Sequence, residues 1–139
     1  MRKQRGRNIY WGAVILDTFK ALQDARLRGI DYKVLFYLCS EMKADDNKAF
    51  VKQKQIAEAL RCDKGNISKA IKHLCELQFI AKAENGFMIN PHLFYVGKPD
   101  HLLLEKRYQF DDLVTSSSEK KRFNFDETDS KLEIDEESL

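Results

Sequence analysis

One stretch, residues 53–90, constrains the fold more than any other, because it holds two short amphipathic helices, a tight turn and a hairpin signal in that order. The segment QKQIAEALR predicts the first helix, with Ile56, Ala57 and Leu60 facing inward. Asp63 is a good N-cap for the second helix, over KGNISKAIKHLCELQ. That helix has apolar residues at the i, i+3, i+4, i+7 spacing of a buried face: Ile67, Ala70, Ile71, Leu74 and Leu77.

A β-hairpin is predicted directly after the second helix. The apolar runs FIAKA and FMIN flank the dipeptide Asn85-Gly86, whose residues both tolerate the positive φ of a type I′ turn. Two helices joined by a turn and followed by a hairpin form a winged helix-turn-helix. The predicted fold class is therefore α+β, mainly α, built on a winged helix-turn-helix.

The flanking segments carry weaker local signals. Asp31 is predicted to cap a helix over DYKVLFYLCSEM, KADDNKAF to form a loop, and residues 49–51 to form a short strand. In residues 9–27 the run IYWGAVIL has strand composition, and Asp17 can cap a helix over TFKALQDARL that buries Phe19 and Leu22. A last helix is predicted over residues 100–113.

Charge divides the chain into a basic body and an acidic tail. Residues 1–108 hold 20 Lys+Arg against 12 Asp+Glu, a balance of +8, whereas residues 109–139 hold 4 against 10, a balance of −6. We predict a basic arm at residues 1–8, a winged-helix domain at 9–114 with its flanking segments, and a disordered acidic tail at 115–139. The basic body favours a polyanionic partner, most often nucleic acid.

The exposed face of the second helix is the predicted DNA-reading surface. Its polar residues include no carboxylate to repel phosphate: Lys64, Asn66, Ser68, Lys69, Lys72 and His73. By reach, Asn66 and Ser68 are expected to meet base edges in the major groove, and Lys69 and Lys72 to contact guanine or phosphate. Lys64 and His73 are expected to contact phosphate.

Two neighbouring segments are expected to contact the backbone of the same duplex. The first is the start of the preceding helix, with Lys52, Gln53 and Lys54. The second is the hairpin wing, with Lys82, Asn85 and Gly86 at the minor groove or its phosphates. The predicted partner is double-stranded DNA.

Motifs for catalysis, metals or membranes are missing from the sequence. His73, His92 and His101 stand far apart, no H-x-H, H-E-x-x-H or phosphate-loop motif occurs, and no apolar run has the length of a membrane span. Three cysteines without a C-x-x-C pair indicate free thiols in a reducing cytosol. We therefore expect a cytoplasmic protein that is not an enzyme, needs no cofactor or metal, and does not enter a membrane.

Three segments within residues 30–97 carry a family resemblance: the helix YKVLFYLCSEM, the stretch QIAEALRCDKGNISKAIKHLCELQFIAK and, above all, the ending NGFMINPHLFYVG. In that ending a hairpin runs into Ile89, Asn90, Pro91, Leu93 and Phe94. The chain thereby resembles the RepL-type plasmid replication proteins of Firmicutes and other Gram-positive bacteria. The resemblance implies a plasmid-encoded protein that binds origin DNA and supports replication initiation or maintenance by recruiting host replication proteins, without nuclease activity.

Two other functions are compatible with the same pattern. A winged-helix transcriptional regulator would use the same reading helix, and some winged helices are protein-interaction modules that bind no DNA. Dimerisation is plausible through residues 9–27 or through the leucines at 102–104, because proteins that read paired half-sites are commonly two-fold symmetric. The acidic tail either contacts a host protein or competes with DNA for the basic face.

Overall fold

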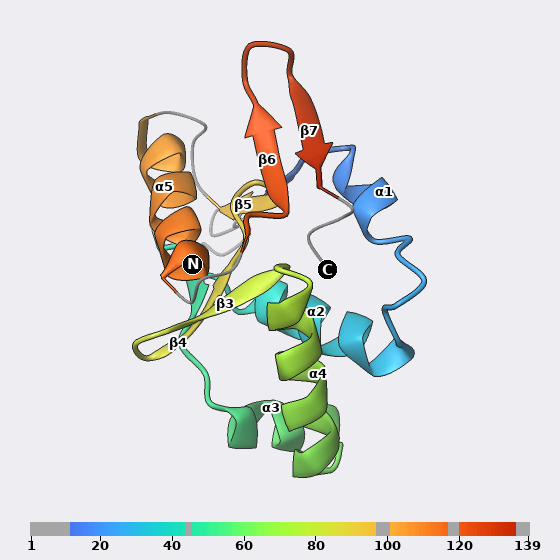
Figure 1. Cartoon of the computed structure of the whole chain (residues 1–139). Coiled ribbons are helices and arrows are strands. Elements are labelled where there is room, and N and C mark those ends of the chain that lie inside the picture. The colour runs from blue at the N-terminus through green and yellow to red at the C-terminus, as the bar shows by residue number, and fades with distance from the viewer. Residues whose placement is uncertain (1–11, 44–45, 97–100, 117–119, 136–139) are drawn as a thin grey trace, which may run out of the picture.

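The computed structural model describes residues 12–43, 46–96, 101–116 and 120–135, so the predicted basic arm lies outside the described residues. The elements follow in the order β1 (Gly12–Val14), α1 (Thr18–Ala21), α2 (Gly29–Ser40), β2 (Lys48–Ala49), α3 (Gln53–Leu60), α4 (Lys64–Glu76), β3 (Ile80–Ala83), β4 (Gly86–Ile89), β5 (Phe94–Val96), α5 (His101–Thr115), β6 (Phe123–Asp126) and β7 (Lys131–Ile134). Helices α2, α3 and α4 pack together beside an antiparallel sheet of order β2–β4–β3 (Figure 1). The class is mixed α+β, as predicted.

The two helices and the turn between them form as the periodicity predicts. Helix α3 ends at Arg61, which takes a left-handed conformation with φ of 54° and turns the chain. Asp63 caps α4 as predicted, since its carboxylate accepts hydrogen bonds from the amides of Gly65 at 3.0 Å and Asn66 at 3.4 Å. The apolar stripe of α4 is at most 1% exposed at Ile67, Ala70, Ile71 and Leu74. One face of α4 is therefore fixed to α2 and α3.

Helix α2 begins at Gly29, earlier than predicted, and Asp31 is not its N-cap. Asp31 is the third helical residue, and its Oδ2 accepts a hydrogen bond from the Arg28 amide at 2.8 Å. The Asp31 carboxylate thus reaches back from the first turn and accepts from the amide of the N-cap residue Arg28, which would otherwise bond to water. Strand β2 likewise starts one residue earlier than the predicted strand at 49–51.

The wing forms where the hairpin signal predicts it, but its turn is different. Ala83 pairs with Gly86, so the two turn residues are Glu84 and Asn85, and Asn85 has no positive φ. The predicted type I′ turn over Asn85-Gly86 is therefore wrong. Gly86 is needed for another reason: a Cβ atom there would lie 2.1 Å from the carbonyl oxygen of Ala49 in the neighbouring strand. Close approach of two strands, rather than turn geometry, requires this glycine.

Helix α5 forms as predicted and covers the wing. Ala81 and Met88, from the two wing strands, pack with Phe110 and Val114 of α5 in a small apolar cluster. Alternate residues of the same strands, such as Ile80 and Ile89, point into the main core. The wing is thus packed on both faces, with the helix-turn-helix on one side and α5 on the other.

The segment between residues 9 and 27 forms less helix than predicted. Strand β1 pairs antiparallel with β5, but α1 stops at Ala21 and Phe19 is 53% exposed rather than buried. The Asp17 side chain makes no cap hydrogen bond to α1; its Oδ2 accepts from the Leu132 amide at 3.3 Å instead. The Asp17 carboxylate therefore bonds to β7, far away in the sequence, and not to α1, which it was predicted to cap.

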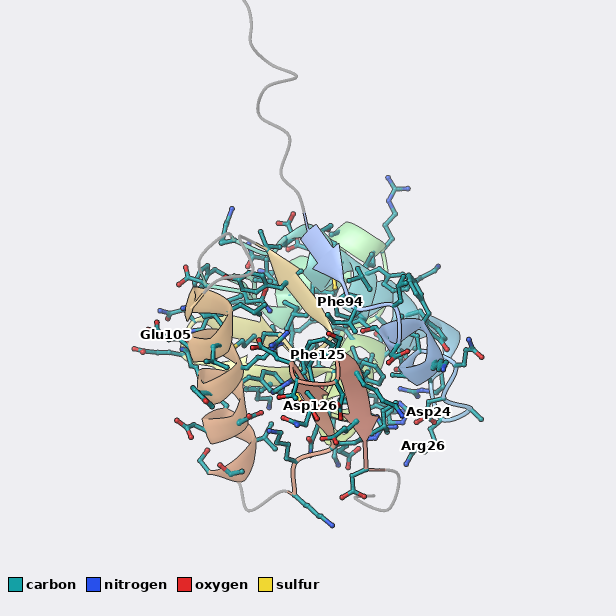
Figure 2. The ribbon with its side chains drawn as sticks, turned by 90° about the horizontal axis from the view of Figure 1, so that it is seen from above. Asp24, Arg26, Phe94, Glu105, Phe125 and Asp126 are labelled. Carbon is teal, nitrogen blue, oxygen red and sulfur yellow. The ribbon has the colours of Figure 1, made fainter. Side chains whose placement is uncertain are left out.

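The predicted disorder of residues 115–139 is wrong for residues 120–135. Strands β6 and β7 form an antiparallel hairpin in which Phe123 is 1% exposed and Leu132 is 5% exposed, both in the main core. Figure 2, viewed onto this end of the molecule, shows Phe125 and Asp126 of the hairpin between Glu105 on α5 and Asp24 beside α1. An acidic composition suggested a solvated tail, yet apolar residues at alternate positions give one strand face that packs.

Candidate nucleic-acid interface

Five of the six residues predicted on the reading face of α4 are exposed together. Lys64, Asn66, Ser68, Lys69 and Lys72 all project from the helix on positions between its buried stripe. Lys64 and Asn66 lie in the first turn, whose amides are held by Asp63, and the others follow over the next two turns. The exposed side of α4 therefore presents three lysines and two uncharged polar groups without a carboxylate until Glu76.

His73 does not belong to this face, and its predicted phosphate contact is not supported. Its Nδ1 lies 2.6 Å from Oδ2 of Asp31, a residue with no exposed surface, so the histidine ties α4 to the start of α2. Burial alone would raise the pKa of Asp31, but hydrogen bonds from Arg28 and His73 outweigh it and hold that pKa below its ordinary value. The sequence did not indicate this contact, because Asp31 lies next to His73 only after α2 packs against α4.

The start of α3 and the wing come together around a groove of about 520 Å³. It is lined by predicted contact residues from both segments, among others: Lys52, Gln53, Lys82, Asn85 and Gly86. Lys52, Lys82 and Asn85 are exposed, while Gln53 and Gly86 are partly buried. Lys54 is exposed on α3 but does not line this groove.

A second hollow, of about 510 Å³, connects the wing with the reading helix. Ser68 and Lys72 line it from α4, Gln53 from α3 and Lys82 from β3. Gln53 and Lys82 line both hollows, so the predicted residues of three elements share one continuous surface. Lys64, Asn66 and Lys69 lie outside both hollows, toward the start and outer side of α4.

Sequence reasoning missed three features of this surface. The end of α5 forms a wall of the second hollow through Leu113 and Val114. A carboxylate, Glu84 in the wing turn, lines the first groove. Arg61 is exposed in the turn before α4, and a basic residue at the last position of the first predicted helix was the available signal.

Other reactive groups in the described part of the chain have structural surroundings. His92 is buried, and its two ring nitrogens lie 3.0 Å from Asp111 Oδ1 and 3.0 Å from the Phe125 amide. The three cysteines are free thiols, and burial raises the pKa of Cys39 to about 12 and of Cys75 to about 11. No cluster of three or more metal-ligating side chains occurs within the ranges that the structure describes. Across the same ranges, no helix has the length and apolar character needed to cross a membrane.

Comparison with known protein families identifies a helix-turn-helix domain at residues 25–80. The matched range covers α2, β2, α3 and α4 and ends at the first residue of β3. It includes the exposed face of α4 and most of the first two segments that carry the plasmid replication resemblance, but not the ending NGFMINPHLFYVG. No curated protein and no solved structure matches the chain in the corresponding comparisons.

Proposed function

We propose that the protein binds duplex DNA by placing α4 in the major groove. One observation carries the proposal: α4 is anchored by a stripe that is at most 1% exposed, while Lys64, Asn66, Ser68, Lys69 and Lys72 are exposed on its other side. A groove about 12 Å wide admits a helix held in this way. The helix-turn-helix match over residues 25–80 supports DNA binding at the level of the domain.

Each part of the surface has a proposed role. Asn66 and Ser68 read base edges, and Lys69 and Lys72 contact guanine or phosphate. Lys64 and the residues at the start of α3 (Lys52, Gln53, Lys54) bind the backbone, and the wing residues Lys82, Asn85 and Gly86 lie at the minor groove or its phosphates. We assign no catalytic step and no cofactor to this surface.

At the level of biology, we propose that the bound DNA is a plasmid origin and that the protein acts in replication initiation or maintenance, together with host replication proteins. The support is the resemblance to the RepL-type proteins in residues 30–97. Within the quoted ending, residues 90–93 form the turn between β4 and β5, where the Asn90 amide side chain donates to the Gln78 carbonyl at 2.9 Å and accepts from the His92 amide at 2.9 Å. The domain match itself equally favours a transcriptional regulator of the same fold.

Footprinting on the plasmid that carries the gene tests the proposal, because it yields the site, its spacing and its symmetry together. Asn66→Ala is expected to relax discrimination at one base pair by about 1–3 kcal/mol, whereas Lys69→Ala weakens binding to all sequences alike. Parent-like binding by both variants would refute the assigned face. A plasmid that replicates normally after deletion of the gene would refute the replication role and leave the regulator.

A further inference from the structure

The outer edge of β1 is unpaired in the described part of the protein. In the β1–β5 pair, the Ile15 amide donates to the Leu93 carbonyl at 3.2 Å. Because hydrogen-bonded and non-hydrogen-bonded pairs alternate in an antiparallel ladder, the Val14–Phe94 pair is of the second kind, and the Val14 amide and carbonyl point away from β5. No described residue bonds these two groups. Figure 2 shows β1 beside β5 at the viewed end of the molecule.

Other strand edges of this region are covered by side chains. On β5, Asn47 accepts from the Val96 amide at 3.1 Å and donates to the Phe94 carbonyl at 3.1 Å. On β6 the Phe125 amide donates to His92, and on β7 the Leu132 amide donates to Asp17. Each of these three strands thus has outward groups that a side chain bonds, whereas no described side chain bonds the outward groups of Val14.

Three large apolar side chains at or near this edge are exposed. Val14 is 40% exposed, Leu16 79% and Phe19 53%, so three of the seven exposed large hydrophobic side chains in the described residues fall within residues 14–19. From residue 8 to residue 16 the sequence has no charged residue and no proline. Natural monomers usually protect an open strand edge with charged residues or proline. Because β1 has neither, it has the character of an interface strand.

We propose that β1 pairs antiparallel with β1 of a second copy of this chain, giving a homodimer with a continuous β5–β1–β1–β5 sheet. An antiparallel pair about a two-fold axis is self-complementary, so one open edge suffices for both copies. Val14 then packs against its counterpart, Leu16 lies at the margin of the paired strands, and the uncharged edge meets no repulsion. The inference does not depend on DNA binding, although a two-fold dimer would offer two α4 helices to paired half-sites.

Sedimentation equilibrium of the full-length protein without DNA tests the proposal. The parent is expected to be a dimer that dissociates on dilution. Leu16→Asp is expected to weaken the dimer by at least about tenfold, because it places a charge at the margin of an apolar contact. Val14→Pro is expected to do the same by removing an outward amide that β5 does not use. Leu104→Asp, which changes another exposed leucine, on α5, is the matched control and leaves the dimer intact.

Small-angle X-ray scattering supplies an independent readout. The radius of gyration is expected to fall as the parent is diluted, and to be independent of concentration in Leu16→Asp. If Leu16→Asp does not fold, Leu16→Ser repeats the test. The Leu16 side chain is 79% exposed, so an uncharged replacement should leave the fold intact and still weaken the dimer. A parent that stays monomeric at every concentration, or a dimer that survives all three variants at Val14 and Leu16, would overturn the inference.

Discussion

The helix-turn-helix and the C-terminal hairpin belong to the same apolar core, yet they are held there in different ways. Helix α4 packs through an apolar stripe that repeats along its own sequence, with Ile67, Ala70, Ile71 and Leu74 facing α2 and α3. The hairpin packs through a few apolar residues and through polar contacts to residues far away in the chain. Arg122 alone donates to Asp24 at 2.7 Å and to the Leu77 carbonyl at 2.9 Å.

The polar contacts of the hairpin meet the chain at the junction between α4 and the wing. Gln78 is buried there in a left-handed conformation, with φ of 62°. Its side chain donates to the Lys120 carbonyl at 2.6 Å and accepts from the Arg122 amide at 2.7 Å. The C-terminal segment therefore supports the carboxyl end of α4, although its composition resembles that of a solvated tail.

The largest effect should follow from breaking the Arg122–Asp24 pair, whose side chains are only 3% and 12% exposed. Arg122→Met is expected to lower the free energy of unfolding by about 1–3 kcal/mol, because it leaves the buried Leu77 carbonyl without its donor, whereas Asp24 keeps its hydrogen bonds from Arg26. Lys120→Met is the control, since its pair with Asp135 has a lysine that is 73% exposed and is worth at most about 1 kcal/mol. Urea titration measures both. Equal effects of the two substitutions would mean that the hairpin is not part of the cooperative core.

A smaller effect, confined to mild acid, should arise at His92, which joins α5 to β6. Burial lowers the pKa of His92 further than Asp111 raises it, so the folded protein holds the ring neutral. Its Nδ1 accepts from the Phe125 amide, and protonation would remove that acceptor. The unfolded state then takes up the proton more readily, so stability is full above the unfolded value of about 6.5 and falls as the pH drops below it.

Thermal unfolding across the pH range checks this second prediction. His92→Gln, which can still donate and accept, should remove the loss between neutral and mildly acidic pH. The paired carboxylates Asp31 and Asp111, whose pKa values are lowered, contribute only at more acidic pH. An unchanged pH profile in His92→Gln would show that the ring does not titrate with unfolding.

The smallest effect is expected on the helix-turn-helix side, at the cap of α4. Asp63→Ala removes the acceptor for the Gly65 and Asn66 amides and should cost about 1 kcal/mol of stability. Asp63→Asn, which also caps helices well, is the control and should cost less. Since the cap is local, calorimetry should show a lower melting temperature without a change in the pH dependence that His92 controls. A loss as large as that in Arg122→Met would contradict the local character of this region.

Sequence alone predicted the parts of the fold that local chemistry determines. The stripe of α4, the Asp63 cap, the wing strands and α5 all follow from spacing or from one residue and its neighbours. The errors occur where a distant segment decides the outcome. Asp17 bonds to Leu132 rather than capping α1, His73 bonds to the buried Asp31, and Phe123 finds a core that its acidic surroundings do not indicate.

For the candidate site the same distinction holds. Residues on the exposed side of α4 could be chosen from helical spacing, since their exposure depends on one helix only. The wall that Leu113 and Val114 add to the hollow beside Lys72 depends on the packing of α5 against the wing. No residue in α5 signals that contact in sequence.

Charge reversal at Lys69 tests the central claim most directly, with Lys131→Glu as the matched control on β7, where the side chain is also exposed. Fluorescence anisotropy would follow each variant on a duplex selected from a random-sequence pool, over a salt series. Lys69→Glu is expected to weaken binding by at least about tenfold and to reduce the salt slope by about one, whereas Lys131→Glu binds like the parent. Equal affinities of the two variants, or a parent that binds no duplex at all, would contradict a DNA-reading role for α4.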